Sequence, residues 1–310
     1  MSSAPVVSKS LCSECRKECE IKRYTYCANC WDSWFNSHAA KHYDFIEIGT
    51  CDWGTLTQFC DGDEEHGAWL AREIRTSLDD LRQCRGLAVD AVAEHLQALP
   101  DLPRVQKVVA SMDETSGDKK KLYFVSPAQI QQHMGQYFAP VPIDPNCAHW
   151  EERPEVDVMW YAKSMSSIGQ RQPQLVKMLE EVNRPDLLEE RQVWTCSWAE
   201  LCVTHGVASV DVVQIDCEGK DCAILRGLLA YCADRPQAFP RVIKFECNHL
   251  SSHAEADEVL DKLRRHGYVV RSKTGNDVVV ERMPTTEFRA GGCWDMCVKV
   301  RKLVFGDKCN

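Results

Sequence analysis

Four cysteines near the amino terminus have the residue type and the spacing of a metal site. Cys12 and Cys15 form one Cys-x2-Cys pair, and Cys27 and Cys30 form a second pair after eleven intervening residues. Two such pairs can close a tetrahedral thiolate shell around one Zn²⁺, and a shell of four protein ligands stabilises a fold without catalysing a reaction. We therefore expect residues 1–42 to form a treble-clef-like or zinc-ribbon-like module around a structural Zn²⁺.

Further ligands are available to this module. Cys19, His38 and His42 each offer a thiolate or an imidazole that could replace one of the four cysteines or contribute to a second site. The alternative for the whole cluster is a set of solvent-exposed thiols, which would be susceptible to oxidation.

Acidic residues and a glycine form the second group of candidates. Glu47 and Gly49 lie at the end of an apolar stretch, and Asp90 ends the next one. A glycine there allows close backbone approach, and a carboxylate can accept hydrogen bonds from an ammonium group or from ribose hydroxyls. Folds that bind S-adenosylmethionine hold the nucleoside in this way, whereas the missing Gly-x-Gly-x-x-Gly disfavours a nicotinamide dinucleotide. The alternative is a turn glycine beside two solvated carboxylates.

The elements that must position these residues follow from the periodicity of the apolar residues. From residue 43 onward, stretches typical of buried strands alternate with stretches typical of amphipathic helices. This alternation predicts an α/β fold with a doubly wound, mostly parallel sheet, in which ligands bind beyond the carboxyl ends of the strands. We expect strands at 43–48, 86–90, 105–111, 121–125, 210–216, 240–246, 268–271, 278–281 and 296–304. We expect helices at 67–84, 219–232 and 252–266, and a long loop at 139–157.

The segment 211–227 carries the most specific motif of the chain. It reads DVVQIDCEGKDCAILRG and strongly resembles the D-x-x-K-I-D-x-E-G-x-[DE]-x-x-x-L-x-G block of FkbM-type S-adenosylmethionine-dependent methyltransferases. The resemblance extends over roughly residues 43–283, and the family's other motifs occur in the same order, at 47–50, 86–90, 194–201 and 242–246. Two positions depart from it: Gln214 stands where the family often has Lys, and Trp53 stands where it often has a small residue.

This resemblance implies a seven-stranded, Rossmann-like methyltransferase domain over residues 43–310, with S-adenosyl-L-methionine as cofactor and S-adenosyl-L-homocysteine as product. The implied acceptor is most simply a hydroxyl oxygen of a small molecule or glycan. The cofactor-binding residues that it implies are Glu47, Gly49, Thr50, Asp52, Asp90, Ser111 and Asp216.

Methyl transfer to an alcohol also requires removal of the hydroxyl proton, by a positioned base or with the help of a metal. Asp216 ends a predicted strand and is the first candidate for this role, although it could instead cap the helix that follows. Glu246 and His249 follow the next strand and are the further catalytic or metal-binding candidates. Residues 164–169, which read SMSSIG, could line the acceptor pocket or form an ordinary turn.

Composition and charge exclude other classes of protein. The chain has 37 Lys and Arg against 46 Asp and Glu, and the resulting net charge of −9 disfavours nucleic acid as a partner. It contains no apolar run of about 18 residues, and its first residues lack the pattern of a secretion signal. We therefore expect a cytoplasmic protein with no membrane partner; the sequence indicates no oligomeric state.

Two alternatives to a small-molecule methyltransferase stay open. One is a methyltransferase that acts on protein or RNA and uses the zinc module for recognition. The other is an interaction protein that keeps the fold and the cofactor site but has lost catalysis.

Overall fold

The computed structural model describes residues 10–11, 18–19, 41–51, 66–75, 83–140, 155–247 and 250–283. The four expected zinc ligands, Cys12, Cys15, Cys27 and Cys30, lie outside these ranges, and so do His38, Asp52, His249 and the strand expected at 296–304. The zinc site therefore stays a prediction. Two short strands of the amino-terminal region, β1 (Ser10–Leu11) and β2 (Glu18–Cys19), pair antiparallel.

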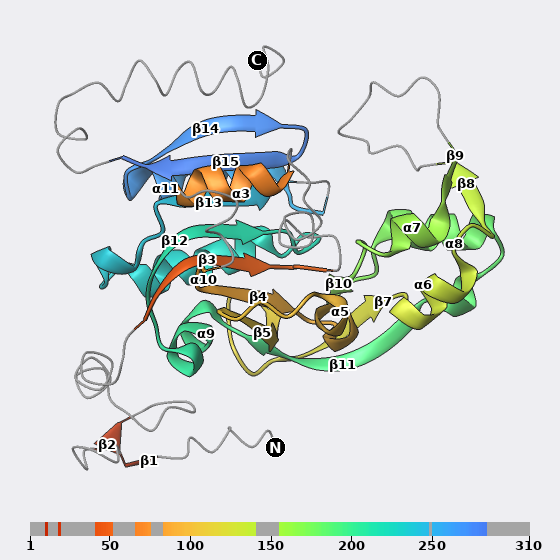
Figure 1. Cartoon of the computed structure of the whole chain (residues 1–310), viewed down its shortest axis with the longest axis horizontal. Helices are drawn as coiled ribbons and strands as arrows, with labels where there is room; N and C mark the ends of the chain where they lie inside the picture. The colour runs from red at the N-terminus through yellow and green to blue at the C-terminus, as the bar shows by residue number, and fades with distance from the viewer. Residues whose placement is uncertain are drawn as a thin grey trace, which may run out of the picture.

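A mixed seven-stranded sheet forms the centre of the α/β fold (Figure 1), in the order β14-β15-β13-β12-β3-β4-β5. The five strands from β13 to β5 pair in parallel, whereas β15 is antiparallel to both of its neighbours. The expectation of a seven-stranded sheet is confirmed, but the sheet is mixed, because β14 and β15 form a hairpin and a short turn reverses the chain. The strands are β3 (Lys41–Ile48), β4 (Gly86–Asp90), β5 (Val105–Val109), β12 (Val207–Ile215), β13 (Val242–Glu246), β14 (Tyr268–Thr274) and β15 (Asp277–Arg282).

Helices pack on both faces of this sheet because successive strand residues point to opposite sides. On β12, Val212 belongs to the core that contains residues of α3 (His66–Ile74) and α5 (Ala93–Ala98). The next residue, Val213, belongs to the larger core on the other face. That core contains residues of α9 (Trp198–His205), α10 (Asp221–Cys232) and α11 (His253–Arg265).

The ends of the helices agree with local signals in the sequence. Helix α11 begins with a capping box, in which Ser252 accepts from the Glu255 backbone and the Glu255 side chain accepts from Ser252. Helix α9 ends at Gly206, which adopts the left-handed conformation typical of a helix stop. The helix expected at 67–84 is described to Ile74, and residues 76–82 lie outside the described ranges.

A second, smaller unit is inserted between β5 and α9 and lies where the parallel strands of the large sheet end (Figure 1). Its sheet has the order β10-β7-β11-β6, and β7 contains most of the strand expected at 121–125. The expected loop at 139–157 begins and ends in two paired strands, β8 and β9. The strands are β6 (Ser111–Met112), β7 (Lys119–Phe124), β8 (Phe138–Pro140), β9 (Glu155–Asp157), β10 (Ser167–Ile168) and β11 (Glu189–Cys196). The helices of this unit are α6 (Pro127–His133), α7 (Val158–Ala162), α8 (Pro173–Glu181) and the 3₁₀ helix η1 (Pro185–Leu187). Outside the unit, a further 3₁₀ helix, η2 (Pro236–Ala238), precedes β13.

No helix in the described part of the chain is long and apolar enough to cross a membrane.

Candidate functional site

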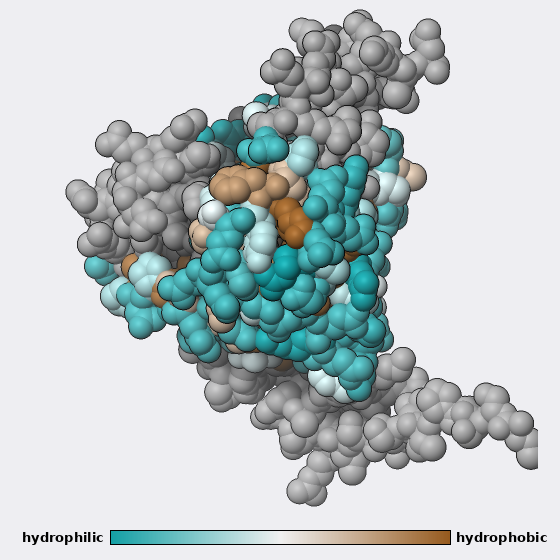
Figure 2. All heavy atoms as spheres, turned by 90° about the vertical axis from the view of Figure 1, so that its right-hand side faces the viewer, coloured by the Kyte–Doolittle hydropathy of each residue, from teal (hydrophilic) through white to brown (hydrophobic). Residues whose placement is uncertain are grey.

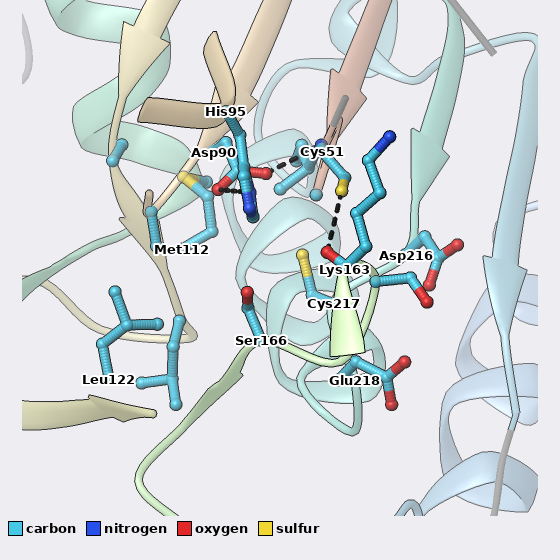
Figure 3. Close-up of a pocket in the computed structure, with 16 residues that line it drawn as sticks. Cys51, Asp90, His95, Met112, Leu122, Lys163, Ser166, Asp216, Cys217 and Glu218 are labelled. Carbon is cyan, nitrogen blue, oxygen red and sulfur yellow. Dashed lines mark hydrogen bonds and ion pairs between the residues drawn. The ribbon is translucent and has the colours of Figure 1, made fainter. Parts of the chain in front are cut away.

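A pocket lies between the carboxyl ends of β3, β4 and β12 and the second unit, and its empty space is about 490 Å³ when the part open to solvent is included. Figure 2 looks onto this end of the molecule, where a small group of hydrophobic residues interrupts a mostly hydrophilic surface. Figure 3 shows His95, Asp90, Met112 and Leu122 at one side of the pocket and Asp216 and Glu218 at the other. One side of the pocket thus carries the carboxyl groups of Asp216 and Glu218, whereas the other combines the apolar Met112 and Leu122 with Asp90 and His95.

Gly49 brings the ends of β3 and β12 together. Its φ of +80° lies in the left-handed region, and a Cβ atom at this position would lie 1.8 Å from the backbone oxygen of Asp216. Only glycine tolerates both the conformation and the contact. From the sequence we expect the backbone to approach a ligand closely at this position, whereas in the structure it approaches the backbone of the neighbouring strand.

Asp90 ends β4 and connects two segments of the pocket wall. Its carboxylate accepts hydrogen bonds from the backbone N–H of Cys51 at 2.8 Å and from that of Val92 at 2.7 Å. The Cys51 thiol in turn donates to the backbone oxygen of Lys163, at 3.1 Å, and so connects this loop to the second unit. Each carboxylate oxygen of Asp90 keeps a further lone pair, because a carboxylate can accept about four hydrogen bonds.

Three carboxylates converge at the acidic side of the site. One oxygen each of Asp216, Glu218 and Glu246 lies within 4.8 Å of the other two. Burial, followed by the charges of Glu246 and Asp216, raises the pKa of Glu218 well above its usual range. Such a group can share protons among its members or offer oxygen ligands to a divalent cation.

Asp216 can accept a proton near neutral pH. Its side chain is open to solvent at the rim of the pocket, yet protein surrounds it on most sides. This burial and the like charge of Asp277 raise the pKa of the Asp216 carboxyl to about 6, and the charge of Lys244 acts in the opposite direction. Above that pH the ionised carboxylate predominates, which is the form that a general base requires.

Asp221, at the start of α10, holds these strand ends in place. It is fully buried, and its carboxylate accepts from the backbone N–H of Cys217 at 3.3 Å and of Glu246 at 3.0 Å. One side chain therefore binds the segments that carry Asp216 and Glu246. Burial, together with the charge of Asp216, raises the pKa of Asp221 to about 8, although both backbone N–H groups oppose this shift.

The raised pKa of Asp221 predicts a pH-dependent stability. Because the folded protein holds this proton more tightly than the unfolded chain, the free energy of unfolding should decrease as the pH rises from about 4 to about 8. Asp221→Asn removes the titrating group, so its free energy of unfolding should decrease less over this interval. Chemical denaturation at several pH values measures both curves. The exposed Asp257 on α11 provides the matched control, Asp257→Asn, and equal slopes for wild type and Asp221→Asn would contradict the assignment.

The structure brings only some of the expected binding residues to the pocket. Gly49, Asp90 and Asp216 line it, and Glu246 joins Asp216 in the carboxylate cluster. The remaining described candidates, Glu47, Thr50 and Ser111, are buried outside the set of lining residues.

Two of these remaining candidates have identifiable surroundings. Glu47 lies opposite Gln214 on the sheet face that α3 covers. The Thr50 hydroxyl donates to the backbone oxygens of Glu47 and Val89, both at 3.3 Å, so it stabilises the turn after β3. His42, which the sequence offers as a further zinc ligand, is exposed on β3 and hydrogen-bonds to Ser209 at 2.9 Å.

The second unit contributes pocket residues that sequence reasoning only partly finds. Ser164, Ser166 and Ile168 line the pocket, which agrees with the first of the two interpretations of the segment 164–169. Sequence reasoning misses His95, Met112 and Asp221. For Asp221 a signal is available, because it occupies the [DE] position of the block at 211–227.

No protein-family model matches the chain, and no curated protein matches it. The functional interpretation therefore depends on the motifs in the sequence and on the geometry of the pocket.

Proposed function

We propose that the protein is an S-adenosylmethionine-dependent methyltransferase that transfers a methyl group to a hydroxyl oxygen of a small molecule or glycan. The observation that carries the proposal is the convergence of Gly49, Asp90 and Asp216 in one pocket, at the carboxyl ends of three neighbouring parallel strands. Ligands of α/β sheets bind at this edge. The same three residues belong to the motifs that resemble those of FkbM-type methyltransferases.

The side chains that line the pocket suit this cofactor. Asp90 has lone pairs available for ribose hydroxyls, and the apolar side chains of Met112 and Leu122 lie on the same side of the pocket. At the other side, the carboxylate of Asp216, which is ionised above about pH 6, attracts the positive charges of the sulfonium and the ammonium group. The cofactor supplies an electrophilic methyl group. The residues of the chain must position this group and remove the proton from the acceptor hydroxyl.

Asp216 is assigned to the acceptor side of this reaction. With a pKa raised to about 6 and a position at the rim of the pocket, its carboxylate can accept a proton from an incoming hydroxyl group at neutral pH. Asp221 acts as a positioning residue, because it fixes the backbone on both sides of the carboxylate cluster. Holding donor and acceptor in line contributes independently to the rate.

The proposal includes a cytoplasmic location and a structural Zn²⁺ in the amino-terminal module. Both follow from the sequence alone.

Transfer of a radiolabelled methyl group from S-adenosylmethionine to a panel of hydroxyl-bearing small molecules and glycans tests the proposed reaction. Parallel reactions with protein and RNA fractions separate the alternative acceptors. Label on protein or RNA alone would move the acceptor to that class. The absence of transfer by a protein that binds the cofactor would instead support a non-catalytic interaction protein.

Asp90 should contribute directly to cofactor affinity. Asp90→Ala removes the acceptor for the ribose hydroxyls, and we expect weaker binding by about 1.5–3 kcal/mol, the range for hydrogen bonds to a charged group. Asp90→Asn should be milder, because its amide oxygen still accepts. Isothermal titration calorimetry with S-adenosylhomocysteine measures both. Asp101→Ala, which changes an exposed aspartate beside Lys107, is the control; wild-type affinity in both Asp90 variants would place the ribose elsewhere.

A further inference from the structure

The imidazole of His95 is buried at the pocket without a hydrogen-bond partner among the described residues. The side chain is 2% exposed, yet neither Nδ1 nor Nε2 makes a hydrogen bond within the described part of the chain. A buried polar group without a partner costs about 1–3 kcal/mol. Most buried polar atoms in proteins are paired, so an exception calls for an explanation such as an absent ligand.

The surroundings of His95 indicate what kind of ligand would meet it. His95 lies on α5, which follows the strand that ends at Asp90, and Figure 3 shows its ring beside the Asp90 carboxylate among the residues that line the pocket. The lining of the same pocket includes small or apolar residues, among them Ala91, Ala110, Met112, Leu122 and Ile168. Small-molecule pockets usually combine apolar lining residues with a few placed polar groups, and a flat nucleobase suits such surroundings.

Asp90 determines which ring nitrogen faces the ligand. Its Oδ1 atom lies 3.5 Å from His95 Nδ1, so the carboxylate favours the tautomer that carries its proton on Nδ1. In that tautomer Nε2 is a hydrogen-bond acceptor. It therefore suits a ligand group that donates, such as the exocyclic amino group of a nucleobase, and disfavours a carbonyl at the same position.

We infer that His95 is the residue that selects the nucleobase of the ligand, with Nε2 accepting a hydrogen bond from an exocyclic amino group. This inference rests on the proposed function, because it takes the ligand to be a nucleoside whose ribose lies at Asp90. It extends that function by naming a specificity-determining residue outside the motifs that the sequence analysis identifies. It also accounts for the buried Nε2 atom, which acquires a hydrogen-bond partner when the ligand binds.

The test compares two ligands that differ only at the base. S-adenosylhomocysteine carries a 6-amino group, and S-inosylhomocysteine carries a 6-oxo group at the same position. We expect the wild-type protein to bind the amino compound about 10- to 100-fold more tightly, the difference that one unmet buried hydrogen bond makes. Titration calorimetry measures both affinities, and His205→Leu, which replaces a half-buried histidine on α9, is the control.

Two variants make the prediction specific. His95→Leu should bind both compounds with similar affinity, because neither finds a partner. His95→Gln should gain affinity for the oxo compound, because its amide N–H₂ can donate to the carbonyl. The second variant also covers the case in which His95→Leu does not fold, as judged by its thermal melting curve.

The outcomes separate this inference from the proposed function. If wild type binds S-adenosylhomocysteine but both His95 variants keep the wild-type preference, His95 is a core histidine and the inference is wrong, while the cofactor assignment stands. If wild type binds neither compound, the proposed function fails, and the inference fails with it. Loss of the preference in His95→Leu, with His205→Leu unchanged, supports the inference.

Discussion

Asp216→Asn is expected to lower the rate of methyl transfer by about 10²–10⁴, the usual contribution of a general base. The affinity for S-adenosylmethionine should decrease far less than the rate, because the attraction of Asp216 for the cofactor's positive charges is one contribution to binding among several, whereas its contact with the acceptor acts in the transition state. The substitution preserves the shape of the side chain and removes the charge that a base needs. Steady-state kinetics together with calorimetric titration of the cofactor measure the two quantities separately.

The pH profile distinguishes a base from a structural residue. With the pKa of Asp216 raised to about 6, the rate should increase as the pH rises through that value. Asp277→Asn removes the like charge that raises this pKa and leaves Lys244, its partner at 2.8 Å, unneutralised. The rising limb should therefore move to lower pH in this variant. Wild-type turnover by Asp216→Asn would show that Asp216 is structural and make Glu246 the next candidate.

Gly49→Ala should prevent the two central strand ends from meeting and destabilise the fold by at least about 3 kcal/mol, since it combines left-handed strain with a severe overlap. The added Cβ would lie 1.8 Å from the Asp216 backbone oxygen and 2.7 Å from its carbonyl carbon. Both atoms belong to the backbone, so no side-chain rotation can relieve the contact. Thermal and chemical denaturation measure the loss, and cofactor titration should show no binding.

Gly135 provides a control for this prediction. Its φ of +74° is close to the +80° of Gly49, but a Cβ added there would have no atom within 4 Å. Gly135→Ala therefore isolates the conformational strain, which costs about 1–2 kcal/mol. If the two variants were equally stable, the close approach of β3 to β12 would contribute nothing, and the packing of the strand ends described above would be incorrect.

The sequence predicts the central strands well because their signal is local. Residues 86–90 form the expected strand, and β12 and β13 differ from expectation by a few residues. The reversed direction of β15 carries no such signal, since alternation along a strand is the same for either direction of pairing. The sequence also does not predict that the second unit forms a sheet of its own. In that sheet β7 pairs with β11, which lies about 70 residues further along the chain, and a local pattern carries no signal for such a distant pair.

The site is predicted only where a residue's position at a strand end is sufficient. Asp90 and Asp216 reach the pocket for that reason. Thr50 is adjacent to Gly49 in sequence, but its hydroxyl satisfies the turn and not the pocket. His95 and Asp221 depend on how α5 and α10 pack against the strand ends, and periodicity alone assigns both residues to ordinary helix positions.

Calorimetric titration of the full chain with S-adenosylhomocysteine, and separately with NAD, shows whether the pocket binds the proposed cofactor. We expect saturable binding of S-adenosylhomocysteine at one site per chain and no comparable binding of NAD. Asp90 can accept the ribose hydroxyls of either ligand, but the sequence contains no Gly-x-Gly-x-x-Gly loop for the pyrophosphate of NAD. Tighter binding of NAD, or no binding of S-adenosylhomocysteine by the folded protein, would contradict this expectation.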